Sequence, residues 1–160
     1  MKVVILCGGE GTRLKDATES IPKPLVEVGG KPILWHIMKF YRHYGIKDFI
    51  LCLGYKGEVI KKYFIDHKWR ENDFSLKMHQ GIVYHSENFD DWNITFVDTG
   101  PPNVTKAERL MKIKDFIDED TFMVAYGDGL SDLDLHGLME YHKEHGKIAT
   151  ICAYKEVSIR

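Results

Sequence analysis

A cluster of glycines with an arginine follows the first apolar segment of the chain. Val3-Val4-Ile5-Leu6 is typical of a buried parallel strand, and Gly8-Gly9-Glu10-Gly11-Thr12-Arg13 comes just after it. Glycine has no Cβ, so this backbone can take φ > 0 and turn successive N–H groups towards an anion. Arg13 adds a permanent cation whose planar fork of donors suits phosphate oxygens. The spacing therefore predicts a phosphate site at the end of the first strand.

The alternative interpretation of this loop is a tight strand-to-helix turn with surface charges. Two other phosphate-binding motifs are excluded. Leu14 stands where a dinucleotide fingerprint needs its third glycine, and no Gly-Lys-Ser/Thr follows as in a Walker loop. The missing glycine argues against an NAD-dependent oxidoreductase. Tight binding of NAD would favour that alternative again.

Lys23 is a second candidate for phosphate binding. It lies between Pro22 and Pro24, whose rings fix the backbone around it. A lysine on a stiffened segment loses less conformational freedom when it meets a ligand. The alternative is an ordinary exposed loop lysine.

Asp128 is a candidate metal ligand. It lies between Gly127 and Gly129, directly after the apolar run 121–126, which is typical of a buried strand. The carboxyl end of a central parallel strand is where open α/β sheets bind ligands. A hard carboxylate near a phosphate loop suits Mg²⁺. The alternative is a simple Asp-Gly turn.

Alternating strands and helices must position these residues. The hydrophobic periodicity predicts strands over 3–6, 48–53, 93–97, 121–126 and 148–154, helices over 32–44, 58–68, 105–117 and 132–145, and a hairpin over 74–87. Strands that alternate with helices imply a parallel sheet with right-handed crossovers. The predicted fold class is therefore α/β.

Composition limits the function classes. A chain of 160 residues with a net charge of −2 is expected to form one domain and gives no electrostatic case for nucleic-acid binding. No apolar run approaches the ~20 residues of a membrane span, and no signal peptide is recognisable. Cys7, Cys52 and Cys152 lie in apolar runs, which favours buried free thiols and a cytoplasmic protein. His142 and His145 could suggest a metal site, but solvated side chains are favoured.

Several of these motifs together resemble the sugar-phosphate nucleotidyltransferase family. The resemblance covers residues 1–154, and part of it favours the subfamily that uses CTP and glucose 1-phosphate. It is carried by the glycine cluster, Pro22-Lys23-Pro24, the segments 30–38, 49–57 and 97–100, and Tyr126-Gly127-Asp128-Gly129.

The resemblance implies a Rossmann-like three-layer fold of the nucleotidyltransferase (glycosyltransferase A-like) type. It also implies a reaction in which a nucleoside triphosphate and a sugar 1-phosphate give a nucleotide-sugar and pyrophosphate, in a homo-oligomer. By resemblance, Arg13 and Lys23 are catalytic, Asp128 binds Mg²⁺, and the nucleotide or substrate is bound by Leu6, Gly8, Gly9, Glu10, Gly11, Thr12, Arg13, Lys23, Thr105, Arg109 and Gly127.

Two departures from the family pattern bear on these expectations. The family has Thr-Gly-Gly-Arg where this chain has Thr105-Lys106-Ala107-Glu108-Arg109, so both glycines are absent and Glu108 brings a negative charge. Family members also continue beyond the length of this chain. Residues 1–160 are therefore expected to be a nucleotide-binding nucleotidyltransferase domain that lacks the family's C-terminal sugar-binding part. The alternative function is a catalytically incomplete nucleotide-binding module with a regulatory or assembly role.

Overall fold

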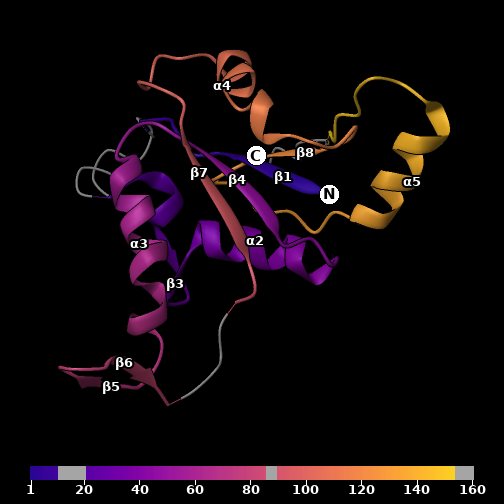
Figure 1. The fold of residues 1–160 in the computed structure, drawn as a ribbon. Coiled ribbons are helices and arrows are strands. Elements are labelled where there is room, and N and C mark those ends of the chain that lie inside the picture. Colours follow the sequence, from indigo (N-terminus) through magenta and orange to yellow (C-terminus); the bar gives the residue numbers. More distant parts are fainter. Residues whose placement is uncertain (11–20, 86–89, 154–160) are drawn as a thin grey trace, which may run out of the picture. The chain divides into compact units, whose positions relative to one another are not determined.

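The computed structural model describes residues 1–10, 21–85 and 90–153 (Figure 1). Gly11, Thr12 and Arg13 lie outside the described residues, so the predictions made for them stay predictions. The chain divides into two compact units, Met1–Leu130 and Ser131–Arg160. Within the described part, no helix combines the length and the hydrophobicity that crossing a bilayer requires.

A parallel sheet forms the centre of the first unit. Its strands in the described residues are β1 (Lys2–Leu6), β4 (Asp48–Leu53), β7 (Asn93–Asp98) and β8 (Met123–Tyr126), in the order β7-β4-β1-β8. Val4 of β1 lies opposite Ile50 on one side and Val124 on the other. The predicted parallel α/β sheet is thereby confirmed, with the glycine loop leaving its central strand.

The position of β8 differs from the prediction. We expected a buried, central strand, whereas β8 pairs only with β1 among the described strands and is half-exposed, with the side chains of Val124 and Tyr126 exposed. An apolar run indicates that a strand packs on a sheet, but it does not indicate how many neighbours the strand has. Asp128 nevertheless follows the carboxyl end of this strand, as expected.

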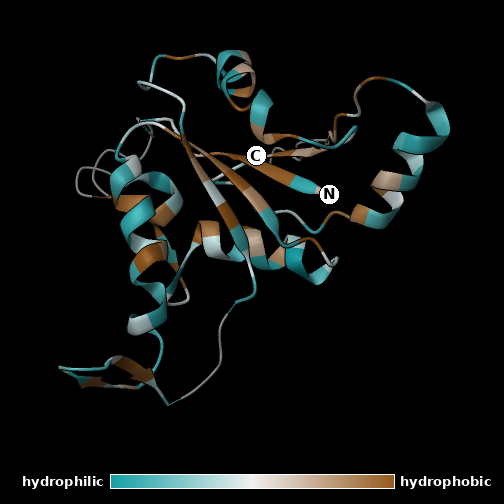
Figure 2. Ribbon diagram, in the orientation of Figure 1, coloured by the Kyte–Doolittle hydropathy of each residue, from teal (hydrophilic) through white to brown (hydrophobic). Residues whose placement is uncertain are grey.

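Helices cover both faces of the sheet, which gives three layers (Figures 1 and 2). Val3 and Ile5 point to the face covered by α2 (Ile33–His43) and α3 (Gly57–Arg70). Val4 points to the other face, where it packs with Ile113, just after α4 (Lys106–Lys112). Alternation along β1 therefore anchors both helical layers to one strand.

Local sequence signals explain where α2 and α4 begin and end. Pro32 precedes α2, and Gly45, with φ 83°, follows the C-cap residue Tyr44. Thr105 caps α4 by accepting from the N–H of Glu108, whose carboxylate accepts in return from the N–H of Thr105. The helix predicted over 105–117 is shorter than expected, because α4 gives way to a short 3₁₀ helix, η3 (Lys114–Phe116).

Smaller elements complete the first unit. The predicted hairpin is confirmed as β5 (Phe74–Lys77) and β6 (Gly81–Tyr84), which pair antiparallel. Lys23 begins a 3₁₀ turn, η2 (Lys23–Leu25), followed by β2 (Glu27–Val28) and β3 (Lys31–Pro32). Pro22 is the N-cap of that turn, so the two prolines around Lys23 do hold it in a defined backbone conformation.

The second unit contains helix α5 (Leu135–His145), capped by Asp134 and ended by Gly146 at φ 60°. The strand predicted over 148–154 is wrong for the described residues 148–153, which form no strand and leave Ile148 and Ile151 exposed. A strand needs a neighbour for its backbone N–H and C=O groups, and no described strand pairs with this segment.

Candidate functional site

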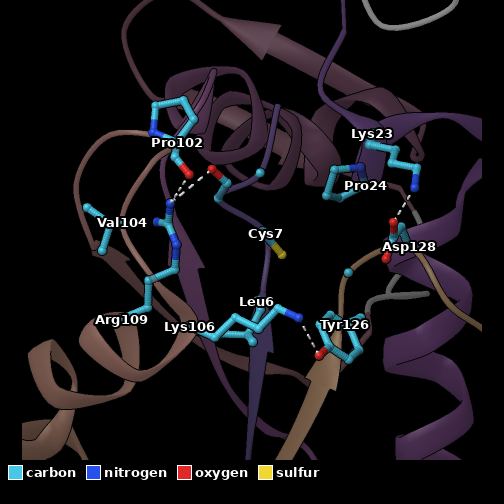
Figure 3. Close-up of a pocket in the computed structure, with 13 residues that line it drawn as sticks. Leu6, Cys7, Lys23, Pro24, Pro102, Val104, Lys106, Arg109, Tyr126 and Asp128 are labelled. Atoms are coloured by element: carbon cyan, nitrogen blue, oxygen red, sulfur yellow. Dashed lines mark hydrogen bonds and ion pairs between the residues drawn. The ribbon is translucent and has the colours of Figure 1, made fainter. Parts of the chain in front are cut away.

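A pocket of about 390 Å³ lies at the carboxyl ends of β1 and β8 (Figure 3). This volume is within the usual range for small-molecule sites. Four segments line it: residues 6–9, the Lys23–Pro24 turn, the stretch from Pro102 to Arg109, and residues 126–128. The structure thus brings together seven of the residues predicted from the sequence: Leu6, Gly8, Gly9, Lys23, Arg109, Gly127 and Asp128.

Gly127 allows β8 to end against the glycine loop. A Cβ at this position would lie 2.8 Å from the Sγ of Cys7 and 3.2 Å from the carbonyl oxygen of Leu6. Its N–H also donates to that carbonyl, at 3.1 Å. A larger residue would therefore push Asp128 away from the loop.

Lys23 and Asp128 form an ion pair across the pocket, although 105 positions separate them in the sequence. Both side chains are partly exposed, at 28% and 36%. The carboxylate of Asp128 is the only acidic group among the described lining residues, and no described group of three or more His, Cys, Asp or Glu side chains could hold a metal ion. One carboxylate suits Mg²⁺ when phosphate oxygens supply further ligands, so the donor set fits a Mg²⁺–triphosphate.

Arg109 is buried, with 4% of its surface exposed. Its Nη1 donates to the hydroxyl of Thr99 at 2.6 Å and to the carbonyl of Leu53 at 3.1 Å. Its Nη2 donates to the carbonyls of Gly8 at 3.2 Å and Pro101 at 2.8 Å. The guanidinium therefore ties the carboxyl ends of two strands, β4 and β7, to the glycine loop.

Glycines make room for this guanidinium. A Cβ on Gly8 would overlap the guanidinium of Arg109, and a Cβ on Gly54 would lie 2.9 Å from its Nη1. Gly9, in contrast, has open space around its Cβ position, and neither Gly8 nor Gly9 has a positive φ. The absence of a side chain at Gly8 thus serves Arg109 as well as any ligand.

The loop also presents backbone donors. The N–H of Cys7 is used by the carbonyl of Cys52, and the carbonyl of Gly8 accepts from the N–H of Tyr55. No described residue accepts from the N–H of Gly8 or Gly9. Both residues line the pocket, which makes their N–H groups candidate donors for an anionic ligand.

Lys106 and Tyr126 are lining residues that the sequence analysis did not assign to the site. The Nζ of Lys106 donates to the Tyr126 hydroxyl at 2.9 Å and lies 4.8 Å from the centre of its ring. The signal that could have found Lys106 was its place in the segment 105–109, where the family pattern has glycine.

Thr105, Glu108 and Glu10 do not line the pocket. Thr105 and Glu108 hold each other in the capping box, and the hydrogen bonds from Thr105 lower the pKa of the Glu108 carboxyl. The carboxylate of Glu108 therefore lies at the start of α4, outside the pocket lining. Glu10 is exposed at the edge of the described loop. Binding roles for Thr105 and Glu10 stay predictions.

Two thiols are buried: Cys7, which lines the pocket, and Cys52. Burial raises the pKa of the Cys7 thiol far above its ordinary value, and Cys52 and Asp128 add to this effect. Burial also raises the pKa of Cys52 to about 11, although Arg109 opposes the shift. Both thiols are therefore protonated at neutral pH and are poor nucleophiles. The third cysteine, Cys152, is exposed, unlike the buried thiol we expected.

Comparison with known proteins agrees with this geometry. The profile of the Nucleotidyl transferase family matches residues 2–158. The chain is 49% identical over 158 residues to a probable glucose-1-phosphate cytidylyltransferase of Bacillus subtilis, covering 99% of this chain and 62% of that protein. It is 48% identical over 155 residues to the glucose-1-phosphate cytidylyltransferase of Salmonella typhimurium, covering 96% of this chain and 60% of the relative. The chain thus spans about 60% of the length of these curated relatives.

A solved structure shares the fold. HddC from Yersinia pseudotuberculosis, in a crystal structure complexed with GMP-PN, superposes with a TM-score of 0.63 at 29% sequence identity. The match covers 88% of this chain and 53% of that one.

Proposed function

Because this chain belongs to the nucleotidyl transferase family, we propose that it transfers a nucleotidyl group from a nucleoside triphosphate to a sugar 1-phosphate. The products are a nucleotide-sugar and pyrophosphate. CTP and glucose 1-phosphate are the favoured substrates, which the 49% and 48% identities to glucose-1-phosphate cytidylyltransferases support. The observation that carries the proposal is the Lys23–Asp128 pair, held beside the N–H groups of the glycine loop. Residues 1–160 form the nucleotide-binding domain in this proposal.

The proposed reaction is a single in-line displacement. An oxygen of the sugar phosphate forms a bond to the α-phosphorus, and the bond from that phosphorus to the oxygen bridging to the β-phosphate breaks. Pyrophosphate leaves with the bonding electron pair. No covalent enzyme intermediate is needed, so the rate must come from positioning and from the neutralisation of phosphate charge.

The residues of the pocket divide these tasks. The N–H groups of Gly8 and Gly9, which donate to no described residue, are proposed to bind phosphate oxygens, as oriented backbone donors do in other phosphate sites. Lys23 supplies a point charge to the reacting phosphates. Arg13, whose role comes from the sequence alone, neutralises the triphosphate and the departing pyrophosphate.

Asp128 is the residue that would hold Mg²⁺. A divalent cation bound there would offset charge on the phosphate oxygens as it accumulates in the transition state. In the structure Asp128 forms an ion pair with Lys23. Substrate binding would break this pair, after which the carboxylate would bind the metal and the ammonium would bind phosphate. An exposed ion pair contributes little stability, and the exchange therefore costs little.

A direct assay tests the proposal. Pyrophosphate release is measured with glucose 1-phosphate, Mg²⁺ and each of CTP, UTP, dTTP and ATP, and calorimetry follows the binding of the same nucleotides. Turnover that is fastest with CTP supports the proposal. Binding without turnover supports instead a nucleotide-binding module with a regulatory or assembly role, and no binding of any nucleotide would contradict both.

Two further features belong to this proposal. A homo-oligomer is implied by the family resemblance, and light scattering on the purified protein measures it. A cytoplasmic location agrees with the unpaired, buried thiols of Cys7 and Cys52.

A further inference from the structure

We infer that Lys106, held in place by Tyr126, binds a phosphate group of the substrates in the pocket. The inference rests on the proposed function and adds a binding residue to it. The phosphate belongs either to the nucleotide tail or to the sugar 1-phosphate, and the experiment below separates these two sources.

The described lining of the pocket has more cations than carboxylates. Its described lining contains three cations, Lys23, Lys106 and Arg109, and one carboxylate, Asp128. That carboxylate is paired with Lys23. Among the described residues, no carboxylate pairs with Lys106 or Arg109. A concave site with unneutralised cations attracts an anion.

Lys106 and Arg109 differ in what they can offer to that anion. The guanidinium of Arg109 is buried and directs both of its Nη atoms to carbonyl and hydroxyl oxygens of the protein. The ammonium of Lys106 is exposed and gives one hydrogen bond, to Tyr126, among the described residues. An ammonium has three N–H donors, so Lys106 keeps donors for a ligand.

Tyr126 makes the position of Lys106 specific. Its hydroxyl accepts from the ammonium at 2.9 Å, and its ring lies beneath the same charge, at 4.8 Å. Hydrogen bonding and the ring together restrict a side chain that would otherwise move freely in solvent. Tyr126 also ends β8, two positions before Asp128, so Tyr126 and Asp128 each contact a lysine at the end of one strand (Figure 3).

The test compares Lys106→Gln with a matched control, Lys114→Gln. Both remove one positive charge from exposed positions 106 and 114 of the same segment, but Lys114 does not line the pocket. Calorimetry with Mg²⁺ measures binding of CTP, glucose 1-phosphate and cytidine to each variant and to the unaltered chain. Cytidine carries no phosphate and reports any contact with the base or ribose.

We expect Lys106→Gln to lower the affinity for one phosphorylated ligand by roughly tenfold or more, because a hydrogen bond to a charged group is lost. The affinity of Lys106→Gln for cytidine should be unchanged. The Lys114→Gln variant should bind all three ligands as the unaltered chain does. A loss confined to CTP identifies the nucleotide tail, and a loss confined to glucose 1-phosphate identifies the sugar phosphate. Tyr126→Phe, which keeps the ring and removes the hydroxyl, should weaken the same ligand to a smaller extent.

Three results would overturn the inference: unchanged binding in Lys106→Gln, equal losses in Lys106→Gln and Lys114→Gln, or a loss for cytidine as large as that for CTP. The proposed function is tested separately by the unaltered chain. If the unaltered chain releases pyrophosphate and Lys106→Gln binds the ligands with the same affinity as that chain, only the inference about Lys106 is refuted. If the unaltered chain binds neither CTP nor glucose 1-phosphate, both proposals fail.

Discussion

The guanidinium of Arg109 and the carbonyl oxygen of Gly8 are joined by a hydrogen bond of 3.2 Å across 101 positions of the sequence. The same guanidinium reaches Thr99 and Leu53, at the carboxyl ends of β7 and β4. Its partners among the described residues are carbonyl and hydroxyl oxygens, so dipoles stabilise the charge. This arrangement makes Arg109 a positioning residue for the loop, whether or not it also touches a ligand.

Replacing Arg109 with methionine should destabilise the fold by about 3 kcal/mol, because the carbonyls of Gly8, Leu53 and Pro101 each lose a hydrogen bond that the guanidinium donates. Urea unfolding monitored by tryptophan fluorescence measures the loss. Arg70→Met is the control, because Arg70 is exposed at the end of α3 and its replacement should change stability by about 0.5 kcal/mol at most. Equal stabilities of the two variants would contradict the role assigned to Arg109.

Gly8→Ala and Gly9→Ala should differ sharply in stability. A Cβ at position 8 overlaps the guanidinium of Arg109, whereas nothing lies within 4 Å of a Cβ at position 9. We expect a loss of about 2 kcal/mol for Gly8→Ala, in the range of overpacking, and little loss for Gly9→Ala. Thermal and urea unfolding of both variants decides the matter, and a Gly8→Ala variant as stable as Gly9→Ala would show that Arg109 can move aside.

Asp128→Asn should lower turnover about a hundredfold or more while the fold survives, because a neutral amide holds Mg²⁺ and Lys23 less well. Stability should change little, since the pair is partly exposed. Steady-state rates over a range of Mg²⁺ concentrations measure the effect. Asp132→Asn removes the same charge outside the pocket lining and should leave the steady-state rate unchanged. A normal rate for Asp128→Asn would remove this residue from the mechanism.

Arg13→Ala is expected to cause a loss of turnover of similar size, also about a hundredfold, because a guanidinium that neutralises the leaving pyrophosphate acts most strongly in the transition state. Steady-state kinetics with CTP and glucose 1-phosphate measure it. Arg160→Ala is a control for the loss of one arginine at the end of the chain. A variant that loses affinity for CTP but keeps its maximal rate would assign Arg13 to binding alone.

The capping box of α4 should give stability that disappears in acid. Hydrogen bonds from Thr105 lower the pKa of Glu108 below its usual 4.5, so the folded state favours the carboxylate. Such a contribution is present above pH 4.5 and is lost as the pH falls through the lowered pKa. The stability advantage of the unaltered chain over Glu108→Gln should therefore shrink between pH 7 and about pH 3. Urea midpoints across that range measure it, and a constant difference would refute the assignment.

Thiol labelling should distinguish the cysteines. Cys7 and Cys52 are buried with raised pKa values, whereas Cys152 is exposed. A thiol reagent at pH 8 should therefore modify Cys152 quickly and the other two only after denaturation. Mass spectrometry of the labelled peptides identifies the sites. Rapid modification of Cys7 in the native protein would mean that the pocket opens widely in solution.

The alternation of strands and helices was readable from the sequence, because each element has its own hydrophobic period. Strand β1, helix α2 and the β5–β6 hairpin lie close to their predicted ranges. The open side of β8 and the missing strand at 148–153 were not readable, because both depend on which neighbour a strand finds. Periodicity describes a segment, while pairing is a property of the whole sheet.

The site divides in the same way. The places of Lys23 and Asp128 in the pocket lining were predictable, because prolines and glycines around them mark special backbone positions. Their direct pairing was not, since 105 residues separate them. The role of Arg109 was hidden for the same reason, and the partner of Lys106 is twenty positions away, on β8.

Because the peptide group is planar, the Gly8–Arg109 hydrogen bond also affects the orientation of the next backbone N–H group. In a trans peptide the C=O and the following N–H point in opposite directions, and neither can rotate alone. Anchoring the oxygen of Gly8 with Arg109 and the N–H of Tyr55 therefore also sets the direction of the amide proton of Gly9. A side chain on α4 can in this way aim a main-chain donor that it never contacts.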